Sequence, residues 1–234
     1  RWLQQTEIGA TSSDGEDTAD AQREFSQKAY PPVAARLDGF LEKFEQEAEA
    51  LEQDEGSIHK SYTQRILHPL MLCSPFINRV YTKPLGFAGD YEMMNMIVDD
   101  PWAGDSAYAR MLNYYILSKA PARAYQGRID MLAQKLAREA VRVAAANGRQ
   151  LQVANVGCGP VSEISKFIRE EEISRRCDFH LYDFNEETIQ FAQERLARSM
   201  RKAQRSPQVT FYRKSIHELL MDAWGDAQPA RPQY

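Results

Sequence analysis

Two glycines and one aspartate have the residue types and spacing of a nucleotide-binding site. Gly157 and Gly159 directly follow the apolar run 151–156, and Asp183 ends the next apolar run of the chain. Glycine takes backbone conformations that are closed to residues with a Cβ atom, and it lets a ligand approach the main chain. A helix that begins after such a turn aims free N–H groups at it, which suits phosphate or another electron-rich group. An aspartate at a strand end can accept hydrogen bonds from a ribose diol.

The elements around these residues predict one half of a mononucleotide-binding unit. A strand over 151–156 leads into the turn, a helix over 161–168 has apolar residues at helical spacing, and a strand over 179–182 ends on Asp183. A dinucleotide fingerprint needs a third glycine three residues after the second, where this chain has Ser162, and this disfavours NAD. A tight turn without a ligand is the alternative, and the position of Asp183 favours a binding site over it.

Three segments in order resemble the motifs of class I S-adenosylmethionine-dependent methyltransferases. The segment 155–160, Asn-Val-Gly-Cys-Gly-Pro, resembles the first motif of that family. The segment 182–189 resembles its second strand end with the following helix, and 209–216 is similar to its third strand and adenine-contacting turn. The resemblance covers roughly 150–222. It implies an α/β fold with a Rossmann-like sheet and S-adenosylmethionine as the cofactor.

The resemblance also implies roles for individual residues. The residues 157–159 would line the methionine part of the cofactor, Asp183 would hold the ribose, and Phe184 would pack on the adenine. Two residues after the third strand would border the adenine edge. The cofactor-binding residues implied in this way are Asn155, Gly157, Cys158, Gly159, Asp183, Phe184, Ser215 and Ile216.

Three positions depart from the family pattern. The family usually has an acid where Asn155 stands, a glycine where Val161 stands, and often an acid where Ser215 stands. These departures keep open a catalytically silent, methyltransferase-like module that acts as a binding partner or regulator. An NAD-dependent oxidoreductase is a second alternative, which Ser162 and the segment 185–187, Asn-Glu-Glu, disfavour.

Composition and charge exclude several classes of partner. The chain has 234 residues, of which 43% are hydrophobic, which is enough for a real core. A net charge of −4 gives no basic field for nucleic acid. No apolar run approaches the about 20 residues of a membrane span. The three cysteines, Cys73, Cys158 and Cys177, have no metal-binding spacing and fit a reducing cytoplasm.

Composition predicts three segments along the chain. The polar and acidic residues 1–20 are typical of a flexible linker or tail, which would join an upstream domain. Residues 21–148 are expected to form an all-α N-terminal cap or substrate domain, and 149–234 a partial Rossmann-like domain with strands 1–3. Only three of the seven strands of a class I sheet are visible, so the glycine-turn strand would be an open edge. We expect the natural protein to continue beyond Tyr234 into a fourth strand, or a second chain to complete the sheet.

Prolines and glycines predict the helix boundaries of the first half. Pro31-Pro32 is expected to break one helix and to open the next. Gly56-Ser57 should end that helix and cap another that runs towards Leu67, and Pro69 and Pro75 should segment the apolar stretch that follows. A long helix is expected to start at Pro121.

The stretch 83–94, Lys-Pro-Leu-Gly-Phe-Ala-Gly-Asp-Tyr-Glu-Met-Met, is the second informative segment. It is either a loop between helices, with Asp90 as the N-cap, or a lid over the methyl donor, and both interpretations stay open. The candidate substrate or lid residues are Lys83, Asp90 and Tyr91. Arg128 joins them because an arginine can bind a carboxylate of cofactor or substrate through two hydrogen bonds.

The sequence indicates an acceptor only through a second resemblance. The stretch 83–94 together with the glycine turn resembles bacterial methyltransferases that make a 3-hydroxy fatty-acid methyl ester signal. This implies O-methylation of a small or fatty carboxylic acid. A carboxylate nucleophile is already ionised and needs no general base, whereas an amine or phenol would need one. No acid–base pair stands out, so the catalytic residues stay unknown.

Overall fold

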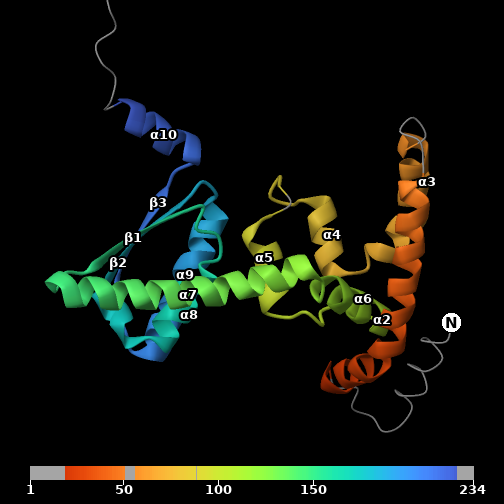
Figure 1. Ribbon diagram of the computed structural model, residues 1–234, viewed down its shortest axis with the longest axis horizontal. Helices are drawn as coiled ribbons and strands as arrows, with labels where there is room; N and C mark the ends of the chain where they lie inside the picture. The colour runs from red at the N-terminus through yellow and green to blue at the C-terminus, as the bar shows by residue number, and fades with distance from the viewer. Residues whose placement is uncertain (1–18, 51–55, 88, 226–234) are drawn as a thin grey trace, which may run out of the picture. The chain divides into compact units, whose positions relative to one another are not determined.

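The computed structural model describes residues 19–50, 56–87 and 89–225. The predicted tail over 1–20 lies outside them except for its last two residues, which belong to the first described helix. The predicted continuation beyond Tyr234 also lies outside. The described fold is α/β, mostly helical with one small parallel sheet (Figure 1).

The chain divides into two compact units. Of the described residues, the helical unit comprises those up to Gly89 together with Met93–Arg123, and the sheet unit comprises Asp90–Glu92 together with those from Ala124 onwards. The division therefore falls near the start of a long helix, whereas the sequence predicted it at 148. The physical reason is that this helix contributes buried side chains to the core beside the sheet.

The helical unit is built around its most buried helix, α6 (Ala107–Leu117). The helix α2 (Ala19–Glu49) packs along α6, and α4 (Pro75–Thr82) contacts it as well. The other helices here are α3 (Gly56–Met71) and most of α5 (Tyr91–Val98). The larger buried apolar side chains of α6 are Met111, Leu112, Tyr115 and Leu117.

The prediction that Pro31-Pro32 separates two helices is wrong. The single helix α2 contains both prolines in its interior, although each removes a backbone donor and disfavours the preceding turn. Contacts with α6 hold the helix on both sides of the prolines. Before them, Tyr30 packs edge-on against an α6 tyrosine at 4.9 Å. After them, Asp38 accepts a hydrogen bond of 2.5 Å from the hydroxyl of Tyr115.

The two later prolines behave differently from each other. Pro75 divides the apolar stretch, as predicted, because it starts α4 behind the N-cap Ser74, whereas Pro69 lies within the last turn of α3 and does not end it. The fully buried Asn113 of α6 fixes the start of α4. Its Oδ1 accepts from the Ser74 hydroxyl at 2.7 Å and from the Phe76 amide at 3.0 Å.

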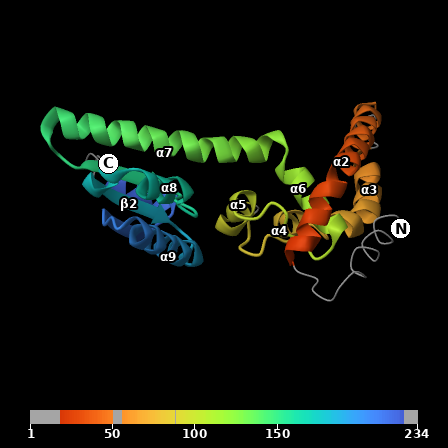
Figure 2. The same ribbon diagram turned by 90° about the horizontal axis from the view of Figure 1, so that it is seen from below.

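The sheet unit confirms the three predicted strands. They are β1 (Leu151–Val156), β2 (Cys177–Asp183) and β3 (Gln208–Arg213), all parallel and in the order β1-β2-β3. Most of α7 (Ala120–Asn147) belongs to this unit, as Figure 2 shows, where it runs beside α8. The remaining elements are α8 (Ser162–Glu170), η1 (Glu172–Arg176), α9 (Glu186–Ala203) and α10 (Ile216–Gly225).

The core of the sheet unit lies on one face of the sheet. Phe179 and Leu181 of β2 are fully buried there, together with Phe167 of α8 and Leu196 of α9. Residues of the other face are more exposed, and His180 lies among them between Tyr212 and Gln152, at 3.0 Å from each. In the described part of the chain, β1 pairs with β2 alone and is an edge of the sheet.

Candidate functional site

The glycine turn leaves β1 through three left-handed backbone positions. Gly157 has a φ of +67°, Gly159 of +54° and Val161 of +50°. The amide of Cys158 donates to the carbonyl of Tyr182 at 2.9 Å, which ties the turn to β2. An added Cβ at either glycine would meet no heavy atom within 4 Å, so the space beside the turn is open to a ligand.

Asp183 holds the turn in place. Its carboxylate accepts the amide of Gly159 at 3.1 Å through Oδ2 and the amide of Asn185 at 3.0 Å through Oδ1. The side chain is buried at the carboxyl end of β2. A carboxylate oxygen has more than one acceptor site, so each can still accept another hydrogen bond. Asp183 thus ties the glycine turn to the carboxyl end of β2 and has acceptor sites left for a further donor.

Apolar side chains are exposed where the three strands end. Val156 at the end of β1 is 48% exposed, Phe184 after β2 is 54% exposed, and Ile216 at the start of α10 is 61% exposed. Large apolar side chains usually avoid water, and an aromatic ring prefers to pack on a flat or branched apolar surface. Phe184 and Ile216 therefore offer exposed apolar surface at this end of the sheet.

Ser215 has a structural role in addition to its predicted place at the adenine edge. Its hydroxyl accepts the amide of Glu218 at 3.2 Å, and the Glu218 carboxylate accepts the Ser215 amide at 2.7 Å. This reciprocal pair is a capping box at the start of α10. The pattern Ser-x-x-Glu was readable in the sequence and explains a serine at this position without a ligand.

Two carboxylates lie around the centre of the turn. The side-chain Nδ2 of Asn155 donates to the Glu163 carboxylate at 3.0 Å, which links the end of β1 to the first turn of α8. Burial is the main cause that raises the pKa of the Cys158 thiol to about 12, and the negative charges of Asp183 and Glu163 contribute to the same rise. Cys158 is therefore a neutral thiol at physiological pH, and its electrostatic environment is negative.

Side chains from α7 and α9 add a polar cluster, of which only Arg128 was expected from the sequence. Burial raises the pKa of Tyr125, and the nearby Glu163 adds to the effect, while a hydrogen bond with Ser162 opposes it. The guanidinium of Arg128 lies 4.9 Å from the centre of the Tyr125 ring. Arg195 donates to the Ser162 hydroxyl at 3.2 Å. Only the packing of three helices brings these residues together, so their spacing in the sequence gave no signal.

The candidate lid residues fall into both units. Tyr91 belongs to the sheet unit, and its ring lies 4.9 Å from that of Phe191 on α9. Asp90 is 1% exposed and directly precedes α5. Lys83 belongs to the helical unit, where it ends α4 in a left-handed conformation with a φ of +48°. Tyr91 and Arg128 are thus the lid and substrate candidates that group with the glycine turn, together with the buried Asp90.

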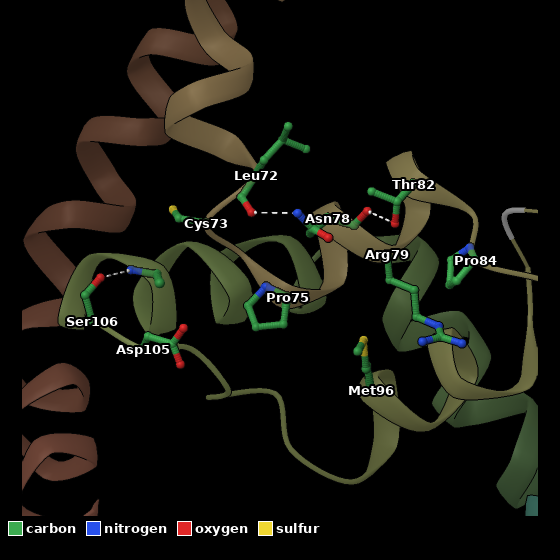
Figure 3. Close-up of a pocket in the computed structure, with 11 residues that line it drawn as sticks. Leu72, Cys73, Pro75, Asn78, Arg79, Thr82, Pro84, Met96, Asp105 and Ser106 are labelled. Carbon is green, nitrogen blue, oxygen red and sulfur yellow. Dashed lines mark hydrogen bonds between the residues drawn. The ribbon is translucent and has the colours of Figure 1, made fainter.

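The helical unit contains a cavity next to Lys83. The cavity has a volume of about 520 Å³, and Thr82 and Pro84 on either side of Lys83 contribute to its wall. Figure 3 shows Arg79 extending from α4 towards Met96 of α5. This size is in the range of small-molecule sites, so the helical unit has a concave surface of its own.

Comparison with known protein families, with curated proteins and with solved structures finds no match to this chain. Within the described ranges, no group of three or more histidine, cysteine or acidic side chains is placed to bind a metal ion. None of the helices described is both long and apolar enough to cross a membrane. The glycine turn is therefore the feature of the described residues that bears most directly on function.

Proposed function

We propose that this chain is an S-adenosylmethionine-dependent methyltransferase whose sheet is the first part of a Rossmann-like class I fold. One observation carries the proposal. Gly157 and Gly159 take left-handed conformations with open space at their Cβ positions, and Asp183 from the next strand holds the second of them. A main chain bared in this way, beside a carboxylate at a strand end, suits an adenosyl ligand.

The charge around the turn favours this cofactor over a dinucleotide. The two charged groups that raise the pKa of Cys158 are the carboxylates of Asp183 and Glu163. S-adenosylmethionine has positive sulfonium and ammonium groups, whereas NAD would place a negative pyrophosphate at the turn. The two carboxylates would attract the positive groups of S-adenosylmethionine and repel a pyrophosphate, so they favour the sulfonium cofactor.

Each part of the site then has a task. The backbone of 157–159 lines the methionine part, and the carboxylate of Glu163, held by Asn155, is available to the ammonium group. Asp183 accepts from the ribose, while Phe184 and Ile216 pack against the adenine. When bound, the cofactor supplies an activated methyl group, and the chain's task is to orient the acceptor and to exclude water.

A carboxylic acid is the acceptor that fits the described residues best. A carboxylate needs no base, and the residue at the centre of the turn, Cys158, stays protonated because its pKa is about 12. Arg128, exposed on α7 beside Tyr125, offers a cation for the carboxylate of a small or fatty acid. Incubation with radiolabelled cofactor and fatty acids should give a labelled ester. Product on an amine or phenol instead would contradict this choice of acceptor.

The cofactor is tested by calorimetric titration of three proteins. Gly157→Ala should weaken binding of S-adenosylmethionine at least about tenfold. The new methyl group enters the open space beside the turn, which the methionine part of the cofactor would occupy. Gly148→Ala is the matched control. Gly148 has a φ of +64° and open space at its Cβ, so its backbone cost equals that at Gly157, with a φ of +67°. The control should bind the cofactor as tightly as the unchanged chain.

The same titrations separate the alternatives. A folded chain that binds NAD and not S-adenosylmethionine would be an oxidoreductase. Binding of the demethylated cofactor with no labelled product from any acceptor would support the catalytically silent module, which the left-handed Val161 and the capping role of Ser215 keep in view. A folded chain that binds none of these ligands would end the proposal.

A further inference from the structure

The helical unit has an arm that the described residues leave uncovered. We define the arm as residues 40–49 of α2 and 58–70 of α3, which lie next to each other in Figures 1 and 2. Every side chain from 40 to 49 is exposed, and in α3 the exceptions are Thr63 and His68. The exposure begins directly after Gly39, where α2 has passed beyond its hydrogen bond to α6.

The arm is apolar along both helices. Phe40 is 61% exposed and Ile58 is 73% exposed. Short helices are marginal in water by themselves, and an amphipathic helix gains its stability by burying its apolar stripe. The exposed large apolar side chains, at spacings of three and four residues, are Phe40, Leu41, Phe44, Ile58, Tyr62, Ile66, Leu67 and Leu70.

The two helices of the arm carry opposite charges. At helical spacing, Glu45 and Glu47 border the apolar stripe of α2, and further glutamates lie at 42 and 49. Lys43 is the single cation of this segment, so its net charge is still negative. Lys60 and Arg65 border the stripe of α3, which contains no carboxylate from Gly56 to Met71. A negative helix and a positive helix therefore lie side by side in one arm, each with an exposed apolar stripe.

We propose that a second copy of this chain covers the arm. A twofold axis would place the α2 segment of each copy against the α3 of the other, which forms a four-helix bundle. This arrangement buries both apolar stripes and satisfies the charge complementarity twice, because an isologous interface repeats each contact. An anionic membrane surface or an acidic partner would attract α3 and repel α2, and a basic partner would do the reverse.

The first test is the mass of the chain in solution by sedimentation equilibrium. A dimer is expected at micromolar concentration. A monomer, or an assembly larger than a dimer, would overturn the proposal, since a closed twofold bundle leaves no further arm to pair.

The second test exchanges the charges of the two helices. The acidic-helix variant Glu45→Lys with Glu47→Lys, and the basic-helix variant Lys60→Glu with Arg65→Glu, each place like charges across both halves of the interface. The dimer dissociation constant of each should rise at least about tenfold. An equimolar mixture of the two variants should restore the dimer, because every pairing between unlike copies is again between opposite charges.

A charge reversal elsewhere is the control. Arg198→Glu with Arg201→Glu changes two exposed cations of α9 in the sheet unit and should leave the dimer unchanged, while circular dichroism verifies that all variants remain helical. Failure of the mixture to restore the dimer would show that these charges act within one copy and would overturn the pairing of α2 with α3. A dimer that tolerates both arm variants would place the interface elsewhere and would also overturn it.

Discussion

At the scale of single residues, Val161 is the least expected feature of the glycine turn. It has a φ of +50° and is completely buried, in a position where the methyltransferase motif that the sequence resembles usually has glycine. A β-branched residue in the left-handed region is an outlier that costs about 1–3 kcal/mol. The turn thus keeps a glycine-like backbone, and the valine side chain fills space in the core between α7, α8 and the sheet.

Val161 gives a test of this conformation. Val161→Ala loses about 1–2 kcal/mol of burial and keeps most of the backbone strain, whereas Val161→Gly loses the side chain and relieves the strain. The glycine variant should therefore be at least as stable as the alanine variant when the free energy of unfolding is measured in urea. At Val153 in the middle of β1 the usual order holds, and glycine should be less stable than alanine by about 1 kcal/mol. If the glycine variant is less stable than the alanine variant at both positions, Val161 is not strained.

At the scale of elements, the helix α2 is determined by its contacts. Pro31 and Pro32 are both exposed in its interior, so they give no packing in return for the lost hydrogen bonds. The hydrogen bonds of Arg110 to Gln22 at 3.1 Å and to Ser26 at 3.0 Å hold the first half of the helix on α6. Tertiary contacts of this kind offset an unfavourable local preference.

Replacement of one proline should therefore stabilise the protein. Pro32→Ala restores a backbone donor and should raise the free energy of unfolding by about 1–2 kcal/mol, after allowance for the greater freedom of the unfolded chain. Pro121→Ala is the control, because Pro121 lies in the first turn of α7, where a missing donor costs nothing. Chemical denaturation of both variants measures the difference. Equal effects of the two substitutions would contradict the account of α2.

At the scale of the whole molecule, the sheet is protected unevenly. β2 is paired on both sides and buried on one face, while β1 is an edge of the described sheet, with Gln152 and Val156 exposed on the other face. An edge strand presents unpaired backbone groups to solvent. Pairing and burial both slow the exchange of backbone amide hydrogens, so β1 and β2 should differ in their exchange rates.

Hydrogen exchange followed by NMR or mass spectrometry tests this directly. The amides of β2 should exchange most slowly in the sheet unit, and those of β1 on average at least about tenfold faster. A mutation is not needed, since α8 and α9 provide internal references. Equal protection of β1 and β2 would contradict the open edge and would show that another strand pairs with β1.

The sequence alone determined the parts of this protein that depend on neighbouring residues. The apolar run 151–156 predicted a strand, the resemblance over 209–216 implied the third strand, and Gly157, Gly159 and Asp183 marked the turn and the strand end beside it. Such signals are local, because a strand has a side-chain period of two and a left-handed turn selects glycine within a few residues.

Only the tertiary structure decided where distant residues meet. It carried α2 through its two prolines, assigned most of α7 to the sheet unit, and brought Tyr125, Glu163 and Arg195 around Ser162. It also paired both oxygens of Asp183 with backbone amides. These outcomes depend on which apolar faces pack together, and that free energy is summed over contacts far apart in the chain, so no local pattern records it.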